Sequence, residues 1–365
     1  MGIDDRPNTG SDISAPRRGL GTIRDAIRLR PFNIGYLGAS VTAQRSGYVA
    51  PLHAELVRRT GQAHQAIVAA IGGLGSISGA FLMDDLLRDR TPDLCFVEFT
   101  TTDVEGYTPL HQVGPAVEGI LRKLIRQGVQ PVLLHLFRID TEYGPGNPVI
   151  SAYERVAEHY GVPSINLAEQ WMRDQAWSQG AYLRDSVHLS EAGAVVCAGQ
   201  ILDELLALPE GSGPDESAAE GPPLHHDAYD GTTIVRAKVK MLDQRARASR
   251  RLFRFNYPFL EIEPGCSLRF EAEKGVTGLL VVVGPRSGRI DVEDPAGVRQ
   301  YELFDQYCHY ERLNTVILTR GASDVRRVSV CLSLDEVDTS ICRVPPTPYS
   351  PSERRLSIVG FLART

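Results

Sequence analysis

Up to position 208, the chain alternates short apolar runs with longer stretches in which apolar residues recur every three or four positions. Short apolar runs bounded by turn residues are typical of buried strands, and the longer periodic stretches are typical of amphipathic helices. This alternation predicts βαβ units and a parallel sheet covered on both faces, in a three-layer α/β/α domain. The strands are expected within 31–40, 63–73, 93–100, 130–137 and 162–168, and the helices within 48–61, 77–89, 116–128, 151–161 and 190–208.

The pattern changes after position 208. Residues 209–223, PEGSGPDESAAEGPP, offer almost nothing to bury, which is typical of a linker or of a surface excursion. Beyond them, short strand-like segments are separated by Gly, Pro and Asp turns, a pattern that predicts an all-β sandwich of jelly-roll character. We therefore predict a flexible lead-in over 1–20, an α/β domain over 21–208, a linker over 209–228 and a β-sandwich domain over 229–365. The strand-like segments are 232–242, 259–265, 267–273, 278–284, 289–297, 299–305, 314–321 and 325–333.

Length and charge limit the classes of protein to consider. A chain of 365 residues favours two domains, and its net charge of −6 argues against a nucleic-acid partner. No apolar run is long enough to span a membrane, and the N-terminus lacks the apolar segment of a signal peptide, so we expect a cytoplasmic protein with no membrane partner. Six cysteines without a CxxC pair suggest neither a zinc site nor a disulfide framework.

A serine stands at the end of the first predicted strand, in the sequence GYLGASVTAQ. Ser40 would lie at the carboxyl edge of the parallel sheet, where open α/β folds build their sites. The helix expected to follow it would point its amides toward a developing oxyanion. Serine also caps helices, so this turn by itself supports a nucleophile and a helix cap about equally.

A second polar cluster, RDSVHLSEAG, precedes the last helix of the α/β domain. Asp185 and His188 are three residues apart, so one short loop supplies both a base and the carboxylate that fixes its tautomer. The alternative is an ordinary turn in which Ser190 caps the next helix. The serine turn at the other end of the same domain favours the catalytic interpretation.

Four segments in order resemble the blocks of the SGNH/GDSL hydrolase family. GASVT is similar to the first block, AAIGGLGS to the second, VEFTTTD to the third and DSVHLSEAG to the fifth. The resemblance covers residues 33–208 and implies an SGNH-like, flavodoxin-like α/β/α fold. Order and spacing agree, which is stronger evidence than any one motif.

The resemblance implies a role for each matching residue. Ser40 is the nucleophile and its amide belongs to the oxyanion hole, His188 is the general base and acid, and Asp185 orients His188. Gly73 matches the oxyanion glycine of the second block, although Gly72 and Gly75 lie close to the same register.

The third block departs from the family pattern. Thr102 stands where the family has an asparagine that donates to the oxyanion, and a threonine hydroxyl has a shorter reach than an amide. Three outcomes are open: Thr102 or Thr101 substitutes, a group from the C-terminal domain completes the hole, or hydrolysis is weak.

Further side chains are weaker candidates for substrate contacts. Tyr107, Phe137 and Arg138 sit on loops after strands, where either substrate binding or loop packing is expected, and His135 lies in an apolar strand, which favours a core histidine. The run QYCHYERL, residues 306–313, suggests a sugar-stacking surface or an edge strand that packs against the neighbouring domain.

The expected reaction is acyl transfer to water through a seryl ester. By analogy with the family, the substrate is a small-molecule or carbohydrate ester, chiefly an O-acetyl sugar. Two alternatives are an O-acyltransferase that uses the same serine and a glycan-binding protein with a degenerate site. No cofactor and no metal are implied, and a homo-oligomer is compatible with the sequence.

Overall fold

The computed structural model describes residues 23–364 except 88–89, 144–145, 175–176, 178–179, 210–212, 215, 243–247, 254–256 and 319–324. The predicted lead-in over 1–20 lies outside the described residues. In the part of the chain that is described, no helix has the length and apolar character needed to cross a membrane.

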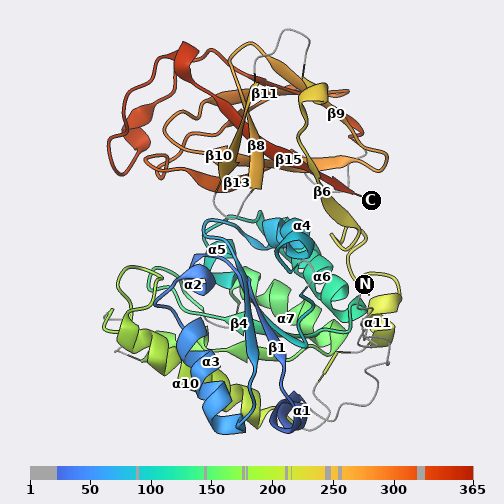
Figure 1. Ribbon diagram of the computed structural model, residues 1–365, viewed down its shortest axis with the longest axis vertical. Helices are drawn as coiled ribbons and strands as arrows, with labels where there is room; N and C mark the ends of the chain where they lie inside the picture. The colour runs from blue at the N-terminus through green and yellow to red at the C-terminus, as the bar shows by residue number, and fades with distance from the viewer. Residues whose placement is uncertain are drawn as a thin grey trace, which may run out of the picture.

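The N-terminal half is built on a five-stranded parallel sheet, as the alternating pattern predicts (Figure 1). Its spatial order is β2-β1-β3-β4-β5. Because alternate side chains of each strand point to opposite faces, both faces are apolar and both are covered by helices. The strands are β1 (Asn33–Gly38), β2 (Gln65–Ala70), β3 (Leu94–Glu98), β4 (Gln130–His135) and β5 (Ser164–Asn166).

Two sets of helices cover this sheet. One apolar core joins a face to α4 (Ser76–Leu87), α6 (Leu110–Arg126) and α7 (Pro148–Tyr160). The other joins the opposite face to α1 (Ile23–Leu29), α3 (Val49–Thr60), α8 (Ala168–Arg173) and α10 (Glu191–Ala207). The short helices are α2 (Ser40–Ala43), α5 (Thr100–Asp103) and α11 (Glu216–Glu220).

The C-terminal half is an antiparallel sandwich of two sheets around a core of its own. The larger sheet has the order β13-β10-β15-β8-β7, with β6 also paired to β15, and the smaller has the order β12-β11-β14-β9. The strands are β6 (Thr232–Arg236), β7 (Ala248–Phe253), β8 (Tyr257–Ile262), β9 (Ser267–Glu271), β10 (Val276–Val283), β11 (Arg289–Asp294), β12 (Gly297–Glu302), β13 (Arg312–Ile317), β14 (Arg327–Leu332) and β15 (Leu356–Arg364), with 3₁₀ turns η1 (Val239–Met241), η3 (Thr339–Ile341) and η4 (Pro351–Glu353).

The sequence pattern missed β7 and β15, and β15 is the more instructive omission. It pairs with β10, β8 and β6, so it lies inside the larger sheet. Ile358 and Phe361 point into the sandwich core, whereas Val359 and Leu362 point to the core shared with the N-terminal domain. A strand buried on both faces loses the alternation of polar and apolar residues by which a strand is recognised.

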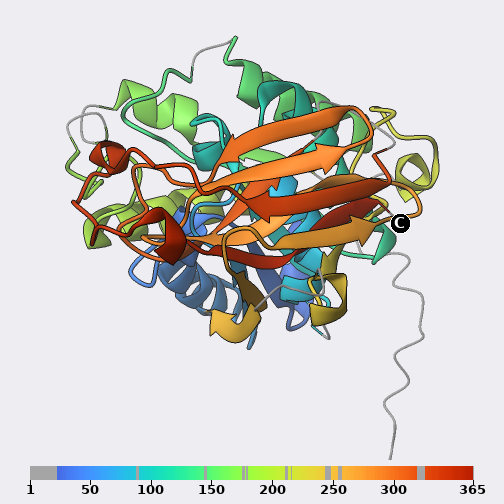
Figure 2. The same ribbon diagram turned by 90° about the horizontal axis from the view of Figure 1, so that it is seen from above.

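The two halves share an apolar interface. Leu280 and Val282 of β10 join Val359 and Leu362 of β15 in the same core as the helices α4 and α6. Figures 1 and 2 show the sandwich resting on this side of the α/β domain. Lys123 on α6 adds a polar contact, because its ammonium group donates to the carbonyl oxygen of Thr232 at 2.8 Å. The larger sheet is therefore covered on both faces.

Candidate active site

The turn that carries Ser40 follows β1 directly. Ser40 is the first residue of α2, a single turn of four residues, and the long helix expected within 48–61 begins at Val49. Gly38 is required before it, because a methyl group at that position would lie 2.4 Å from Thr42 Oγ1 and 2.5 Å from the carbonyl oxygen of Glu98. The close approach of β1 and β3 thus presents a half-buried Ser40 at the carboxyl edge of the sheet.

A buried carboxylate ties this turn to the neighbouring loop. Glu98, at the end of β3, accepts hydrogen bonds from the amide of Thr101 at 3.0 Å and from its hydroxyl at 2.9 Å. The Thr42 hydroxyl donates to the same carboxyl at 3.5 Å. Burial raises the pKa of Glu98 to about 7. Glu98 therefore connects the turn after β1 to the turn after β3.

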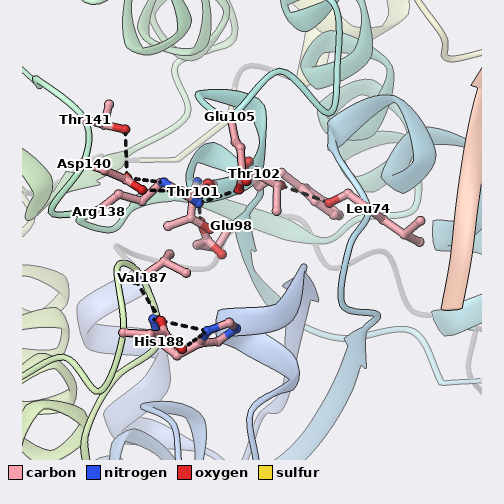
Figure 3. A network of polar contacts seen from close by, with 12 residues as sticks. Leu74, Glu98, Thr101, Thr102, Glu105, Arg138, Asp140, Thr141, Val187 and His188 are labelled. Atoms are coloured by element: carbon pink, nitrogen blue, oxygen red, sulfur yellow. Dashed lines mark hydrogen bonds and ion pairs between the residues drawn. The ribbon is translucent and has the colours of Figure 1, made fainter. Parts of the chain in front are cut away.

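The loop before α10 holds Asp185 and His188 together. Nδ1 of His188 lies 2.9 Å from Oδ2 of Asp185, and Oδ1 accepts the amides of Val187 at 3.0 Å and His188 at 2.7 Å (Figure 3). Burial pushes the pKa of Asp185 upward, but the amide hydrogen bonds from His188 and Val187 outweigh it and leave the pKa below its usual value. An ionised carboxylate accepts only, so it holds a proton on Nδ1 and leaves Nε2 free to act as a base.

Two hydrogen bonds fix this loop against the rest of the site. The Gln44 side chain, just after α2, donates to the carbonyl oxygen of Leu189 at 2.7 Å. The amide of Ile139 donates to the carbonyl oxygen of Ser186 at 2.9 Å. The nucleophile turn, the loop after β4 and the histidine loop are thus held in one arrangement, and sequence reasoning did not single out Gln44.

A single cavity of about 460 Å³ brings these groups together. That volume suits a small organic ligand. Its walls come from both domains: Ser40, Ile71, Gly72, Gly73, Thr101, Thr102, Glu105, Tyr107, Arg138, Asp140, Asp185, Ser186, Val187 and His188 on one side, and Tyr307, Tyr310, Glu311, Arg312, Leu313 and Arg343 on the other.

The glycine segment after β2 lies beside the serine. A methyl group on Gly72 would be 3.3 Å from Cβ of Ser40. Gly73 follows with a positive φ of 78°, so the backbone there adopts a conformation that favours glycine. Gly75 packs elsewhere, because a methyl group on it would lie 2.4 Å from Thr108 Oγ1. The geometry leaves Gly72 and Gly73 as the candidates for the oxyanion glycine.

The hydroxyl of Thr102 is already engaged, which corrects its predicted place in the oxyanion hole. Its Oγ1 lies 2.9 Å from the carbonyl oxygens of both Leu74 and Phe99 and can donate its one hydrogen only to them (Figure 3). The Thr101 hydroxyl donates to Glu98 in the same way. Neither threonine hydroxyl is therefore available to replace the family asparagine.

Arg138 and Tyr107 line the cavity, as predicted for substrate contacts, but Arg138 is mostly occupied by protein. It pairs with both carboxylate oxygens of Asp140 at 2.9 Å and with Glu105 at 2.7 Å (Figure 3). Its chief role here is to hold the loop after β4.

His135 is the core histidine that its apolar strand favours, and Phe137 takes the packing alternative; neither is among the residues that line the cavity. His135 is fully buried, with Nδ1 2.7 Å from Thr100 Oγ1 and Nε2 2.8 Å from Glu154 Oε1. Phe137 packs against the Tyr143 ring in the core behind the sheet. The His135 side chain points into the core because β4 is a central strand with both faces covered, whereas Phe137 lies just after that strand.

The run 306–313 is mostly the loop that precedes β13, and a sugar-stacking role for it stays a prediction. β13 is the edge strand of the larger sheet, and the loop before it brings Tyr307 and Tyr310 to the cavity. Sequence reasoning named this run but not the contribution of Arg312, which adjoins the aromatic residues in the sequence.

Comparison with known proteins agrees with this architecture. Residues 36–196 match the model of the GDSL-like Lipase/Acylhydrolase family. The fold is similar to the crystal structure of a two-domain esterase (CEX) active on acetylated mannans, with a TM-score of 0.74 at 17% identity over 93% of each chain. The structure of that esterase co-crystallized with mannopentaose gives the same TM-score and identity over 94% of this chain and 95% of the other. Among curated proteins, no sequence match was found.

Proposed function

We propose that this chain, whose residues 36–196 match the model of the GDSL-like Lipase/Acylhydrolase family, is an esterase that removes acyl groups, chiefly acetyl, from the hydroxyls of a carbohydrate. One observation carries the proposal: Ser40, His188 and Asp185 line a cavity that is also lined by two tyrosines of the β sandwich, Tyr307 and Tyr310. A tyrosine presents an apolar ring and a polar tip, which suits the mixed surface of a sugar. The likeness to the mannan esterase supports the shared two-domain layout, and the substrate is our inference.

The chemistry follows from the arrangement of the histidine. His188 takes the Ser40 proton on Nε2 while Asp185 holds Nδ1–H and stabilises the imidazolium that forms. The serine oxygen then bonds to the acyl carbon, and the amides of Ser40 and Gly73 receive the oxyanion. His188 returns the proton to the leaving sugar oxygen, and water repeats the sequence on the seryl ester.

The first experiment tests the serine. Reaction of the whole protein with a fluorophosphonate probe, followed by peptide mass spectrometry, should give an adduct on Ser40. Ser40→Ala should abolish both the adduct and hydrolysis of p-nitrophenyl acetate. An adduct at another residue, or full turnover in Ser40→Ala, would refute the assignment.

The second experiment tests the substrate class. Acetate release should be faster from acetylated manno- or xylo-oligosaccharides than from ethyl acetate at equal concentration, because both kinds of ester have an alkoxide leaving group. Equal or slower release from all acetylated sugars would contradict a carbohydrate substrate. Acylated alcohol appearing at the expense of free acetate, when an acceptor alcohol is added, would identify an acyltransferase instead.

A further inference from the structure

Arg312 is a buried arginine of the β sandwich that lines the cavity and has guanidinium nitrogens without a hydrogen-bond partner among the described residues. It begins β13, and its side chain is 7% exposed. Nη2 pairs with the carboxylate of Asp305. Within the described part of the chain, Nε and Nη1 have no hydrogen-bond partner. Buried polar groups are nearly always paired, and leaving charged donors without partners costs free energy. The two unpaired nitrogens therefore indicate that a bound group accepts from them.

The unpaired donors lie next to the glycine segment. A methyl group on Gly73 would be 3.9 Å from both Cδ and Nη1 of Arg312. A methyl group on Gly72, the preceding residue, would be 3.3 Å from Cβ of Ser40. The guanidinium and the serine thus lie beside these two adjacent glycines, and all four residues line one cavity.

The site otherwise lacks one donor. In the family that the sequence resembles, a third-block side chain donates to the oxyanion, and here the hydroxyls of Thr101 and Thr102 are committed to Glu98 and to backbone carbonyls. A donor for that position must come from elsewhere in the wall of the cavity.

We propose that Arg312 of the β sandwich completes the oxyanion hole of Ser40. This inference rests on the proposed esterase function. When the Ser40 oxygen bonds to the acyl carbon, the carbonyl electron pair moves onto the carbonyl oxygen, and His188 holds the serine proton. A guanidinium N–H then donates to that oxygen beside the amides of Ser40 and Gly73. As the electron pair returns, the bond to the leaving alkoxide breaks, and His188 protonates the alkoxide.

The electrostatics suit this role. Burial alone would lower the pKa of Arg312, but the Asp305 carboxylate raises it above its usual value, so the guanidinium stays charged. Because Asp305 balances that charge, the pair offers oriented N–H groups with little net charge. Such preorganised donors stabilise charge that develops in the transition state more than they hold an anion in the ground state. The catalytic centre is therefore complete only when the two domains are packed together.

The test uses p-nitrophenyl acetate, which carries no anionic group for an arginine to recognise. Arg312→Met should lower kcat about a hundred- to a thousandfold, as expected for loss of an oxyanion donor, and leave KM within about threefold. The kcat of Arg312→Lys should lie between that of the wild type and that of Arg312→Met. Guanidinium chloride at a concentration below denaturation should restore part of the kcat of Arg312→Ala.

The control separates this loss from unfolding. Arg354 is another buried arginine of the same domain, and it donates to the carbonyl oxygens of Pro285 and Ser287 at 3.1 and 2.8 Å. Arg354→Met should lower the melting temperature while the folded enzyme keeps its kcat.

Two results would overturn the inference: an Arg312→Met variant, folded by circular dichroism, that keeps kcat within fivefold, or an effect limited to the KM of anionic esters. If wild-type protein is not labelled at Ser40 by the fluorophosphonate, the esterase assignment itself fails. If Ser40 is labelled but Arg312→Met keeps the wild-type kcat, only the role of Arg312 is refuted.

Discussion

The buried carboxyl of Glu98 predicts a measurable dependence of stability on pH. Its pKa is raised from 4.5 to about 7 by burial. Between these values the unfolded chain has released a proton that the folded protein still holds, so the free energy of unfolding falls as the pH rises. One pKa unit corresponds to about 1.4 kcal/mol, and the shift therefore amounts to about 3 kcal/mol over this window.

Glu98→Gln replaces the titrating carboxyl with a neutral amide and keeps the hydrogen bonds. The amide oxygen of glutamine can still accept from the amide and hydroxyl of Thr101, which both bond Oε1 in the native protein. The nitrogen of the new side chain faces Thr42, whose hydroxyl can accept as well as donate. We therefore expect a folded variant whose gain in stability relative to the wild type grows by about 3 kcal/mol from pH 4.5 to pH 7.

Urea unfolding followed by circular dichroism, repeated every half pH unit from 4.5 to 8, measures this difference. Glu293→Gln, at an exposed position of β11, is the matched control and should keep the wild-type pH dependence. Parallel stability curves for Glu98→Gln and the wild type would refute the reasoning, because they would mean that Glu98 releases its proton at the same pH in the folded and unfolded chains.

The remaining predictions concern the nucleophile turn, the relay and the core. Asp185→Asn should lower kcat for p-nitrophenyl acetate about 10⁴-fold with little change in KM, because an amide no longer fixes the tautomer of His188; a loss below tenfold would argue against a relay. Gly38→Ala should destabilise the protein by at least about 1–3 kcal/mol in urea and also lower kcat, because the new methyl group overlaps the Thr42 side chain and displaces Ser40; an unchanged urea midpoint would contradict this. His135→Ala should cost about 2–4 kcal/mol of stability by leaving a cavity in the core and the buried Thr100 hydroxyl without its partner, while kcat of the folded enzyme stays within twofold; a larger fall in kcat at unchanged stability would indicate that His135 acts in the cavity after all.

The elements of the α/β domain were predictable because each carries its own periodicity. Helix α3 ends where expected at Gly61, which adopts a positive φ of 70°, and β1 to β5 fall inside the predicted segments. The Asp185–His188 pair was also predictable, since residues three apart in one loop meet without help from the rest of the fold. By contrast, the missed strand β15 is buried on both faces, and the fate of the Thr102 hydroxyl depends on a carbonyl oxygen 28 residues away.

The sequence by itself determined the two architectures, the serine turn and the histidine loop, because periodicity and short spacing depend only on residues that are close together in the chain. Only the tertiary structure decided which face of the sandwich meets the α/β domain and which arginine of the sandwich lines the cavity that holds Ser40. That choice depends on apolar side chains of β10 and β15 packing on α4 and α6. Apolar packing is not directional, so the orientation depends on complementary shape and on directional contacts such as the hydrogen bond from Lys123 to the Thr232 carbonyl oxygen, which are properties of the assembled fold.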